Sequence, residues 1–137
     1  MLREVEILKA LAEESRLRIV RLLGASEKSL CVCELVNALG MPQYEVSKHL
    51  ATLRNAELLE VERRGTWAYY SARRDDEEVG PWLEFVQEVC VGEVYEEDRK
   101  RLSARLTLRA GERCVVGFVG EEQFVKLVRS RKKGIPA

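Results

Sequence analysis

The stretch that decides the fold is residues 29–59, SLCVCELVNALGMPQYEVSKHLATLRNAELL. Its first half carries apolar residues at the i, i+3, i+4 and i+7 positions that form one face of a helix: Val32, Leu35, Val36 and Leu39. Gly40 is typical of the residue that follows a helix end, and Pro42 is tolerated where the next helix begins. The pattern therefore predicts two short helices joined by a tight turn.

The second of these helices separates apolar from polar residues. Its expected buried side carries Val46, Leu50 and Leu53, and its other side carries Gln43, Tyr44, Ser47, Lys48, His49, Thr52 and Arg54. Gln can bond adenine with two hydrogen bonds, Ser can bond several base edges, and Lys or His can bond phosphates. A helix-turn-helix needs this division, because the apolar side holds the helix while its first turns enter the major groove. Two ordinary amphipathic helices with a solvated polar face are the alternative.

A β-hairpin is expected directly after this helix. Residues 58–62 suit a short strand, residues 63–66 a tight basic turn, and residues 67–70 a second strand rich in β-formers. A hairpin tipped with Arg63 and Arg64 after a recognition helix is a wing, whose arginines would lie against phosphates or the minor groove. The alternative is a solvent-exposed hairpin whose arginines only keep the protein in solution. The expected DNA contacts are Gln43, Tyr44, Ser47, Lys48, His49, Arg54, Arg63 and Arg64.

Two motifs in this order resemble the ArsR/SmtB family: CVCEL at residues 31–35 and QYEVSKHLATLR at residues 43–54. The resemblance runs from about residue 5 to Ala72. It implies a mainly α fold with a small β-hairpin, the winged helix-turn-helix, that dimerises through its terminal helices. Members of this family are bacterial and archaeal repressors that leave operator DNA when a metal ion or metalloid binds. The resemblance therefore implies a homodimeric repressor of the arsenic-sensing type.

Cys31 and Cys33 lie at the start of the first helix of the pair. Side chains at i and i+2 of an ideal helix diverge by about 200°, but the first turn is less constrained, so the two sulfurs can converge if it loosens. Free N–H groups at a helix start also favour thiolates. Soft thiolates select soft acceptors, so we expect As(III) or Sb(III) as inducer, with Cd(II) or Pb(II) also possible and no required cofactor.

A pyramidal As(III) site needs a third sulfur. The arsenic repressors that the sequence resembles place it three positions after the second cysteine, where this chain has Val36. The remaining candidates are Cys90 and Cys114, from the same or a partner subunit, and two thiolates plus water also stay open. Cys90 lies in an apolar stretch, where a plain structural role is favoured.

Several other functions are disfavoured. A structural zinc site needs paired Cys/His spacings, and the family's zinc sensors use histidines, whereas the single histidine here is His49. No phosphate-binding loop, Ser-His-Asp set or paired catalytic carboxylates accompany the cysteines, so we do not expect an enzyme. A redox sensor, in which Cys31 or Cys33 forms a disulfide or sulfenic acid, is the main alternative. A module whose wing binds a protein partner instead of DNA is the third hypothesis.

Size and charge limit the rest. A chain of 137 residues can form a real core plus a dimer surface. No apolar run of membrane length and no signal-peptide pattern occur, so we expect a cytoplasmic protein with reduced cysteines. The net charge of zero conceals ten acids and no base in residues 75–98, against eleven bases and three acids in residues 99–137.

The remaining segments are expected to be mostly helical. We expect helices at residues 2–12, after a Ser15 N-cap to Leu23, around residues 82–89, at 94–109 and at 121–129, and a strand or strap at 114–119. The first helix is core or dimer interface, and the helix after the wing is assigned to dimerisation by the resemblance. We divide the chain into a DNA-binding and dimerisation domain, 1–110, and a C-terminal extension, 111–137, whose basic tail (129–133) is expected to be disordered and solvated.

Overall fold

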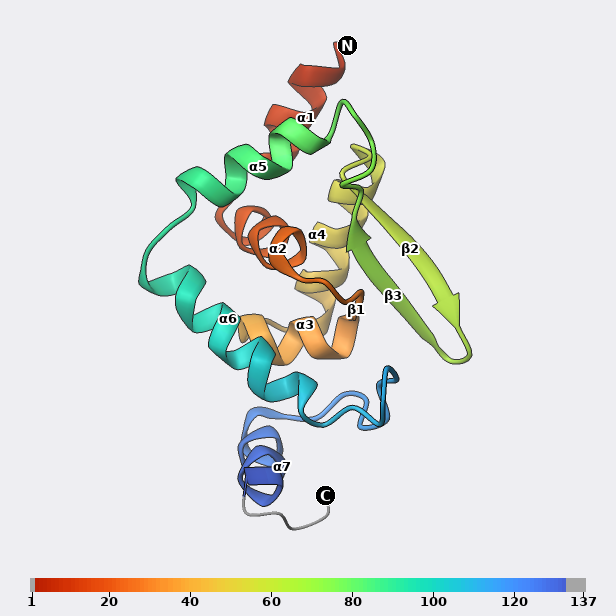
Figure 1. Ribbon diagram of the computed structural model, residues 1–137, viewed down its shortest axis with the longest axis vertical. Helices are drawn as coiled ribbons and strands as arrows, with labels where there is room; N and C mark the ends of the chain where they lie inside the picture. Colours follow the sequence, from red (N-terminus) through yellow and green to blue (C-terminus); the bar gives the residue numbers. More distant parts are fainter. Residues whose placement is uncertain (1, 133–137) are drawn as a thin grey trace.

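The computed structural model describes residues 2–132 and consists of helices around a small sheet (Figure 1). In chain order the elements are α1 (Arg3–Leu11), α2 (Glu14–Ala25), β1 (Leu30–Cys31), α3 (Val32–Leu39), α4 (Gln43–Asn55), β2 (Leu59–Arg64), β3 (Trp67–Ala72), α5 (Gly80–Val89), α6 (Glu93–Leu106) and α7 (Glu121–Lys132). Among residues 2–132, no helix combines the length and apolarity needed to cross a membrane.

The helix-turn-helix and the wing form as the sequence predicts. α3 ends at Gly40, whose φ of 66° is the left-handed conformation that glycine adopts without strain. β2 and β3 form the hairpin, with Leu59 opposite Ala72 and Arg64 opposite Trp67. The expected fold class, mainly α with a β-hairpin in a winged helix-turn-helix, is confirmed.

A third strand, β1, was not expected from the sequence. It pairs antiparallel with β3, placing Leu30 opposite Tyr70 and Cys31 opposite Tyr69, so that the strand order is β1-β3-β2. Two residues are too short a run for an alternating pattern to stand out. This pairing attaches the start of α3 directly to the wing.

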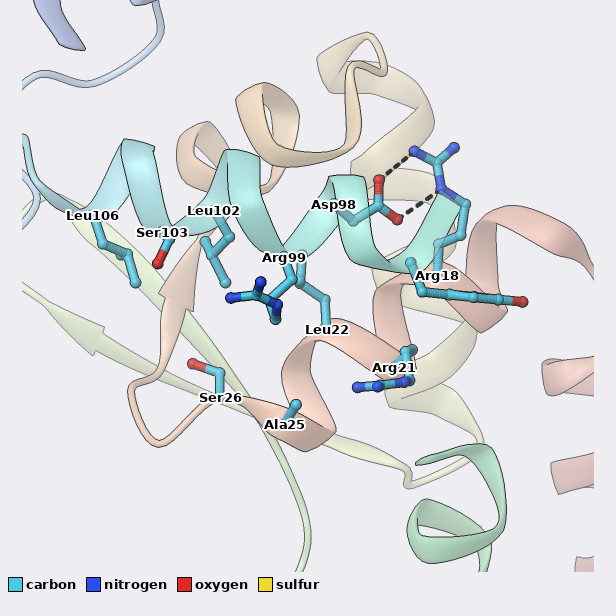
Figure 2. A pocket seen from close by; sticks show the side chains of 11 residues that line it. Arg18, Arg21, Leu22, Ala25, Ser26, Asp98, Arg99, Leu102, Ser103 and Leu106 are labelled. Carbon is cyan, nitrogen blue, oxygen red and sulfur yellow. Dashed lines mark hydrogen bonds and ion pairs between the residues drawn. The ribbon is translucent and has the colours of Figure 1, made fainter. Parts of the chain in front are cut away.

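The main core lies between α2, α3, α4 and the wing, and α6 closes it from below in Figure 1. α6 is a polar helix, and it is held partly by ion pairs. The Arg18 guanidinium faces the buried Asp98 carboxylate at 2.9 and 2.7 Å, beside a pocket of about 200 Å³ between α2 and α6 (Figure 2). Arg18 also donates to the Leu39 carbonyl at the end of α3.

The boundaries differ from the predictions at several points. α2 begins at Glu14 and its N-cap is Glu13, whose carboxylate accepts the Arg16 N–H at 2.9 Å, so the prediction of Ser15 as N-cap is wrong. The helix also continues through Gly24 to Ala25. Residues 114–119 form no strand and follow an isolated bridge between Ala110 and Arg113.

α7 runs to Lys132, three residues beyond its expected end at residue 129. The expectation of a disordered basic tail is therefore wrong for residues 129–132, which form the last turn of this helix. Residues 107–120, which we call the strap, connect α6 to α7 and pack against α3 and the wing. The division at residue 110 stays a prediction. The last residue of the predicted basic tail, Lys133, lies outside the described residues.

Candidate metal centre and nucleic-acid interface

Three cysteine sulfurs meet in one buried cluster. Cys31 Sγ lies 3.0 Å from Cys33 Sγ, and Cys33 Sγ lies 3.2 Å from Cys114 Sγ. All three sulfurs lie within 4.8 Å of one another. The expected divergence of Cys31 and Cys33 is avoided because Cys31 is the N-cap, with an extended backbone (φ −89°, ψ 162°), and only Cys33 lies inside the helix.

Cys31 is held at the helix start by a buried ion pair. Its N–H donates to Glu34 Oε1 at 3.0 Å, which completes a capping box. Arg109 binds both oxygens of Glu34 at 2.7 Å and donates to the Ser29 carbonyl at 2.7 Å. Because both charged groups are buried, loss of either one would cost about 3–5 kcal/mol. Arg109, near the start of the strap, thus fixes the position of the first thiol through Glu34.

Cys114 is held by the wing and by the close packing of the strap. Its backbone N–H donates to the buried Tyr69 hydroxyl at 3.0 Å. Gly117, at φ 73°, packs so close to the wing that a Cβ there would lie 3.1 Å from the Trp67 ring. Phe118 meets the same ring edge-on, with centroids 6.3 Å apart. The third sulfur therefore comes from the strap, 81 residues after Cys33 in the chain.

Hydrogen bonds within the cluster shift the pKa values of its thiols in opposite directions. Hydrogen bonds from Cys31 and Cys33 lower the pKa of Cys114 well below its ordinary value, and the nearby Arg105 charge acts in the same direction. Hydrogen bonds to Cys114 raise the pKa of Cys31 and of Cys33, and burial acts in the same direction on both.

The cluster is buried but is not sealed. A pocket of about 470 Å³ lies between the wing and the strap, and its lining includes Cys114, Tyr69, Trp67, Arg64 and Arg113. Cys114 is thus the residue of the cluster that borders this pocket.

Cys90 does not join this cluster. It is buried in the main core at the end of α5, where its hydrogen bond with Tyr95 raises the pKa of that phenol. Of the two candidates for a third ligand, Cys114 is the one that the fold brings to Cys31 and Cys33.

The outer face of α4 carries most of the predicted DNA contacts. Gln43, Tyr44, Ser47, Lys48 and Arg54 are exposed. The expectation that His49 belongs to this face is wrong, because His49 is 4% exposed. Its Nδ1 lies 3.4 Å from an Arg16 nitrogen and its Nε2 lies 3.8 Å from a Glu13 oxygen. The signal was in the sequence: residues 46, 49, 50 and 53 are spaced i, i+3, i+4 and i+7.

The two wing arginines are both exposed but differ in their contacts. Arg64 donates to Glu62 at 3.1 Å and to the Ser29 hydroxyl at 2.6 Å, and its guanidinium lies 4.4 Å from the Tyr69 ring centroid. Arg63 is the preceding residue of β2, and its side chain is exposed to solvent. Arg64 therefore connects the wing to the surroundings of the sulfur cluster.

Sequence reasoning missed four residues that build the site: Glu34, Tyr69, Arg105 and Arg109. The spacing of Cys31 and Glu34 matches a capping box with cysteine in place of Ser or Thr, and that signal was available. The other three reach the site only through tertiary packing, and no local pattern marks them.

The chain is similar in sequence to known bacterial transcriptional regulators. The model of the family described as "Bacterial regulatory protein, arsR family" matches residues 13–61. The arsenic resistance transcriptional regulator ArsR1 of Pseudomonas putida is 45% identical over 78 residues, 57% of this chain and 58% of that protein. ArsR2 of the same organism is 38% identical over 91 residues, 66% of this chain and 76% of its own length.

The arsenical resistance operon repressor of Escherichia coli is 44% identical over 66 residues, 48% of this chain and 56% of that repressor. The chain thus spans little more than half the length of two of these relatives. Among solved structures, HlyU from Vibrio cholerae is similar, with a TM-score of 0.58 and 31% identity over 65% of this chain and 94% of that one.

Proposed function

This chain belongs to the arsR family of bacterial regulatory proteins, and from that premise we propose that it represses transcription as a homodimer on operator DNA and releases the operator when trivalent arsenic or antimony binds Cys31, Cys33 and Cys114. It is a transcriptional regulator and not an enzyme. The observation that carries the proposal is the approach of three buried sulfurs to within 4.8 Å of one another.

The donor set fits a thiophilic ion. Sulfurs held about 2.3 Å from a soft ion at near-tetrahedral angles lie about 3.8 Å apart. The observed separations of 3.0 and 3.2 Å need to open by less than about 1 Å to reach that value. Three thiolates satisfy trivalent arsenic or antimony, and Cd(II) or Pb(II) also accept thiolates.

The position of Cys31 supports coupling to DNA binding. This residue ends β1, which pairs with β3 of the wing, and it also caps α3, which packs against α4. A shift of Cys31 on ligation therefore acts on both DNA-facing elements. A coupling free energy of about 1–3 kcal/mol is typical between two such sites.

The exposed side of α4 supports the DNA-binding part of the proposal. Gln43 and Ser47 project from its first turns, where a recognition helix meets base edges, and Lys48 and Arg63 are available to phosphates. Tyr44, Arg54 and Arg64 complete the proposed contact set. We do not include His49, because it is buried against α2.

A thiol-redox sensor is a second candidate, and the 3.0 Å approach of Cys31 Sγ to Cys33 Sγ favours it. In that reaction two thiols and one peroxide give a disulfide and two waters, so the cysteines are oxidised and the peroxide is reduced. Oxidation would then release the operator without a metal.

Titration of arsenite into the protein–operator complex, read by mobility shift, tests the proposal. We expect Cys31→Ser, Cys33→Ser and Cys114→Ser each to keep operator binding and to lose arsenite release. Cys90→Ser is the matched control, since it removes a buried thiol outside the cluster and should respond normally. If all three cluster variants respond like the parent chain, the ligand assignment is wrong.

The same titration in a non-dithiol reductant separates the two candidates. Release by arsenite that persists under reduction supports metalloid sensing. Release that appears only with peroxide and is reversed by the reductant supports the redox sensor instead.

A further inference from the structure

We propose that Arg105 is the counter-charge of the sulfur cluster and that it shifts the selectivity of the site towards divalent soft cations, Cd(II) and Pb(II), relative to trivalent arsenic. This inference rests on the proposed function, because it assumes that Cys31, Cys33 and Cys114 ligate the ion together.

Arg105 is a fully buried guanidinium, and none of its hydrogen bonds to residues 2–132 reaches a charged group. Its side chain is 0% exposed. Nε donates to the Asn37 amide oxygen at 2.9 Å and Nη2 donates to the Gly117 carbonyl at 2.6 Å, and both acceptors are neutral. Nη1 has no hydrogen-bond partner within the described part of the chain. A buried guanidinium in this condition is costly unless an anion joins it.

Other arginines that hold α6 and the strap in place are each paired with a carboxylate. Arg101, one turn earlier on α6, binds Glu121 at 2.6 Å, and Arg18 binds Asp98 at 2.7 Å. Arg109, one turn later, is neutralised by Glu34. Within residues 2–132, Arg105 forms no ion pair with a carboxylate of this kind.

Arg105 is hydrogen-bonded to both segments that carry the second and third cysteines of the cluster. Its first acceptor, Asn37, lies one helical turn after Cys33 on α3, and its second, Gly117, lies three residues after Cys114 in the strap. Arg105 therefore spans the two segments that carry the second and third sulfurs.

The net charge of the ligated cluster depends on the ion. Three thiolates give a neutral complex with As(III) and a complex of charge −1 with Cd(II) or Pb(II). Beside Arg105 the divalent complex forms a neutral buried assembly, whereas the arsenic complex leaves the guanidinium unpaired. Because charges interact strongly in a poorly solvated site, the arginine stabilises the divalent complex selectively.

The test measures Cd(II), Pb(II) and As(III) affinities of the reduced full-length protein without DNA, by thiolate-to-ion absorbance and chelator competition. Arg105→Gln and Arg105→Met remove the charge, and we expect each to weaken Cd(II) and Pb(II) binding about tenfold more than As(III) binding, or about 1.4 kcal/mol. Arg105→Lys keeps the charge and should retain most of the parent's selectivity. The two neutral variants differ in bulk and polarity, so either one that folds gives the ratio.

Asn37→Ala is the matched control, because it removes an acceptor of Arg105 and an Nδ2–Val119 hydrogen bond but keeps the charge. We expect it to change all affinities alike. An equal loss for all three ions in Arg105→Gln, or a selectivity change in Asn37→Ala as large as in Arg105→Gln, would overturn the counter-charge role. Failure of the parent chain to bind any of the ions would instead overturn the proposed function itself.

Discussion

At the scale of single residues, Tyr69 connects the two ends of the proposed switch. Its hydroxyl accepts a hydrogen bond from the Cys114 N–H at 3.0 Å. The Arg64 guanidinium lies over its ring, 4.4 Å from the ring centroid. Its backbone pairs with Cys31 across β1 and β3. One buried side chain therefore contacts a proposed ligand and a proposed DNA contact.

Tyr69→Phe removes the hydroxyl and keeps the ring. We expect operator affinity without inducer to change less than about threefold, because the stacking of Arg64 persists. The arsenite concentration needed for release should rise several-fold, since Cys114 loses the acceptor that positions its backbone. An unsatisfied N–H should also lower the free energy of unfolding by about 1–3 kcal/mol, measured by urea titration.

Tyr70→Phe is the control for this variant, because Tyr70 occupies the next position of β3 and projects to the opposite face. It should leave arsenite release unchanged. An identical rise in both variants would mean that the effect belongs to the strand as a whole and not to the Tyr69 hydroxyl.

At the scale of elements, α4 separates into a buried and an exposed side, and this predicts two kinds of variant. Gln43→Ala should relax sequence preference, with a loss of about 1–3 kcal/mol confined to the preferred operator. Lys48→Ala should weaken binding to all sequences and reduce the slope of log K against log salt by about 1. Fluorescence anisotropy with specific and scrambled duplexes at several salt concentrations measures both effects.

His49→Ala serves as the buried comparison on the same helix. We expect it to lower stability with no change in the ratio of specific to nonspecific binding, since the imidazole packs between α4 and the start of α2. Loss of sequence preference in this variant, or an unchanged preference in Gln43→Ala, would contradict the assignment of the α4 faces.

Elements with local patterns were predictable from the sequence. The helix pair, the wing and α5 to α7 follow from periodicity, capping residues and turn signals, which act over a few residues. Helix limits shifted by a few residues where two capping groups compete, as at Glu13 and Ser15. β1 escaped detection because two residues show no alternation.

The sulfur cluster was only half predictable. Cys31 and Cys33 are recognisable because their spacing at a helix start is local. Cys114 was one of two candidates, because its position depends on contacts between distant segments: Arg105 to Gly117, Tyr69 to Cys114, and Trp67 against the strap. No periodicity encodes such contacts, so the choice between Cys90 and Cys114 needed the fold.

At the scale of the whole molecule, the zero net charge conceals an uneven distribution of charged residues, which is compatible with the proposed DNA binding. Arg18, Arg101, Arg105 and Arg109 hold α6 and the strap against α2 and α3. The acidic residues gather in segment 75–98, which includes α5 and the start of α6. Lys48 and Arg54 of α4 and Arg63 of the wing are exposed and are available to phosphates in the proposed complex.

An apolar surface on α1 and α5 supports the proposed dimer. Its exposed residues are Leu2, Leu8, Phe85, Val89 and Val91. The two helices lie at the same end of the molecule in Figure 1, and Arg3 of α1 pairs with Asp76 at 3.4 Å and with Glu78, just before α5. Exposed apolar side chains on neighbouring helices are typical of an interaction surface, and an isologous dimer would cover them.

Phe85→Asp tests this surface, since Phe85 is 50% exposed and a charge there would have to be buried in the dimer. We expect a monomer by sedimentation and a loss of operator affinity of at least about tenfold, because half-sites about 34–36 Å apart must be bound together. Val115→Asp is the matched control: Val115 is 53% exposed but lies on the strap, away from α1 and α5, and its variant should stay dimeric. A Phe85→Asp protein that remains dimeric with full operator affinity would place the interface elsewhere and remove these two helices from the switch.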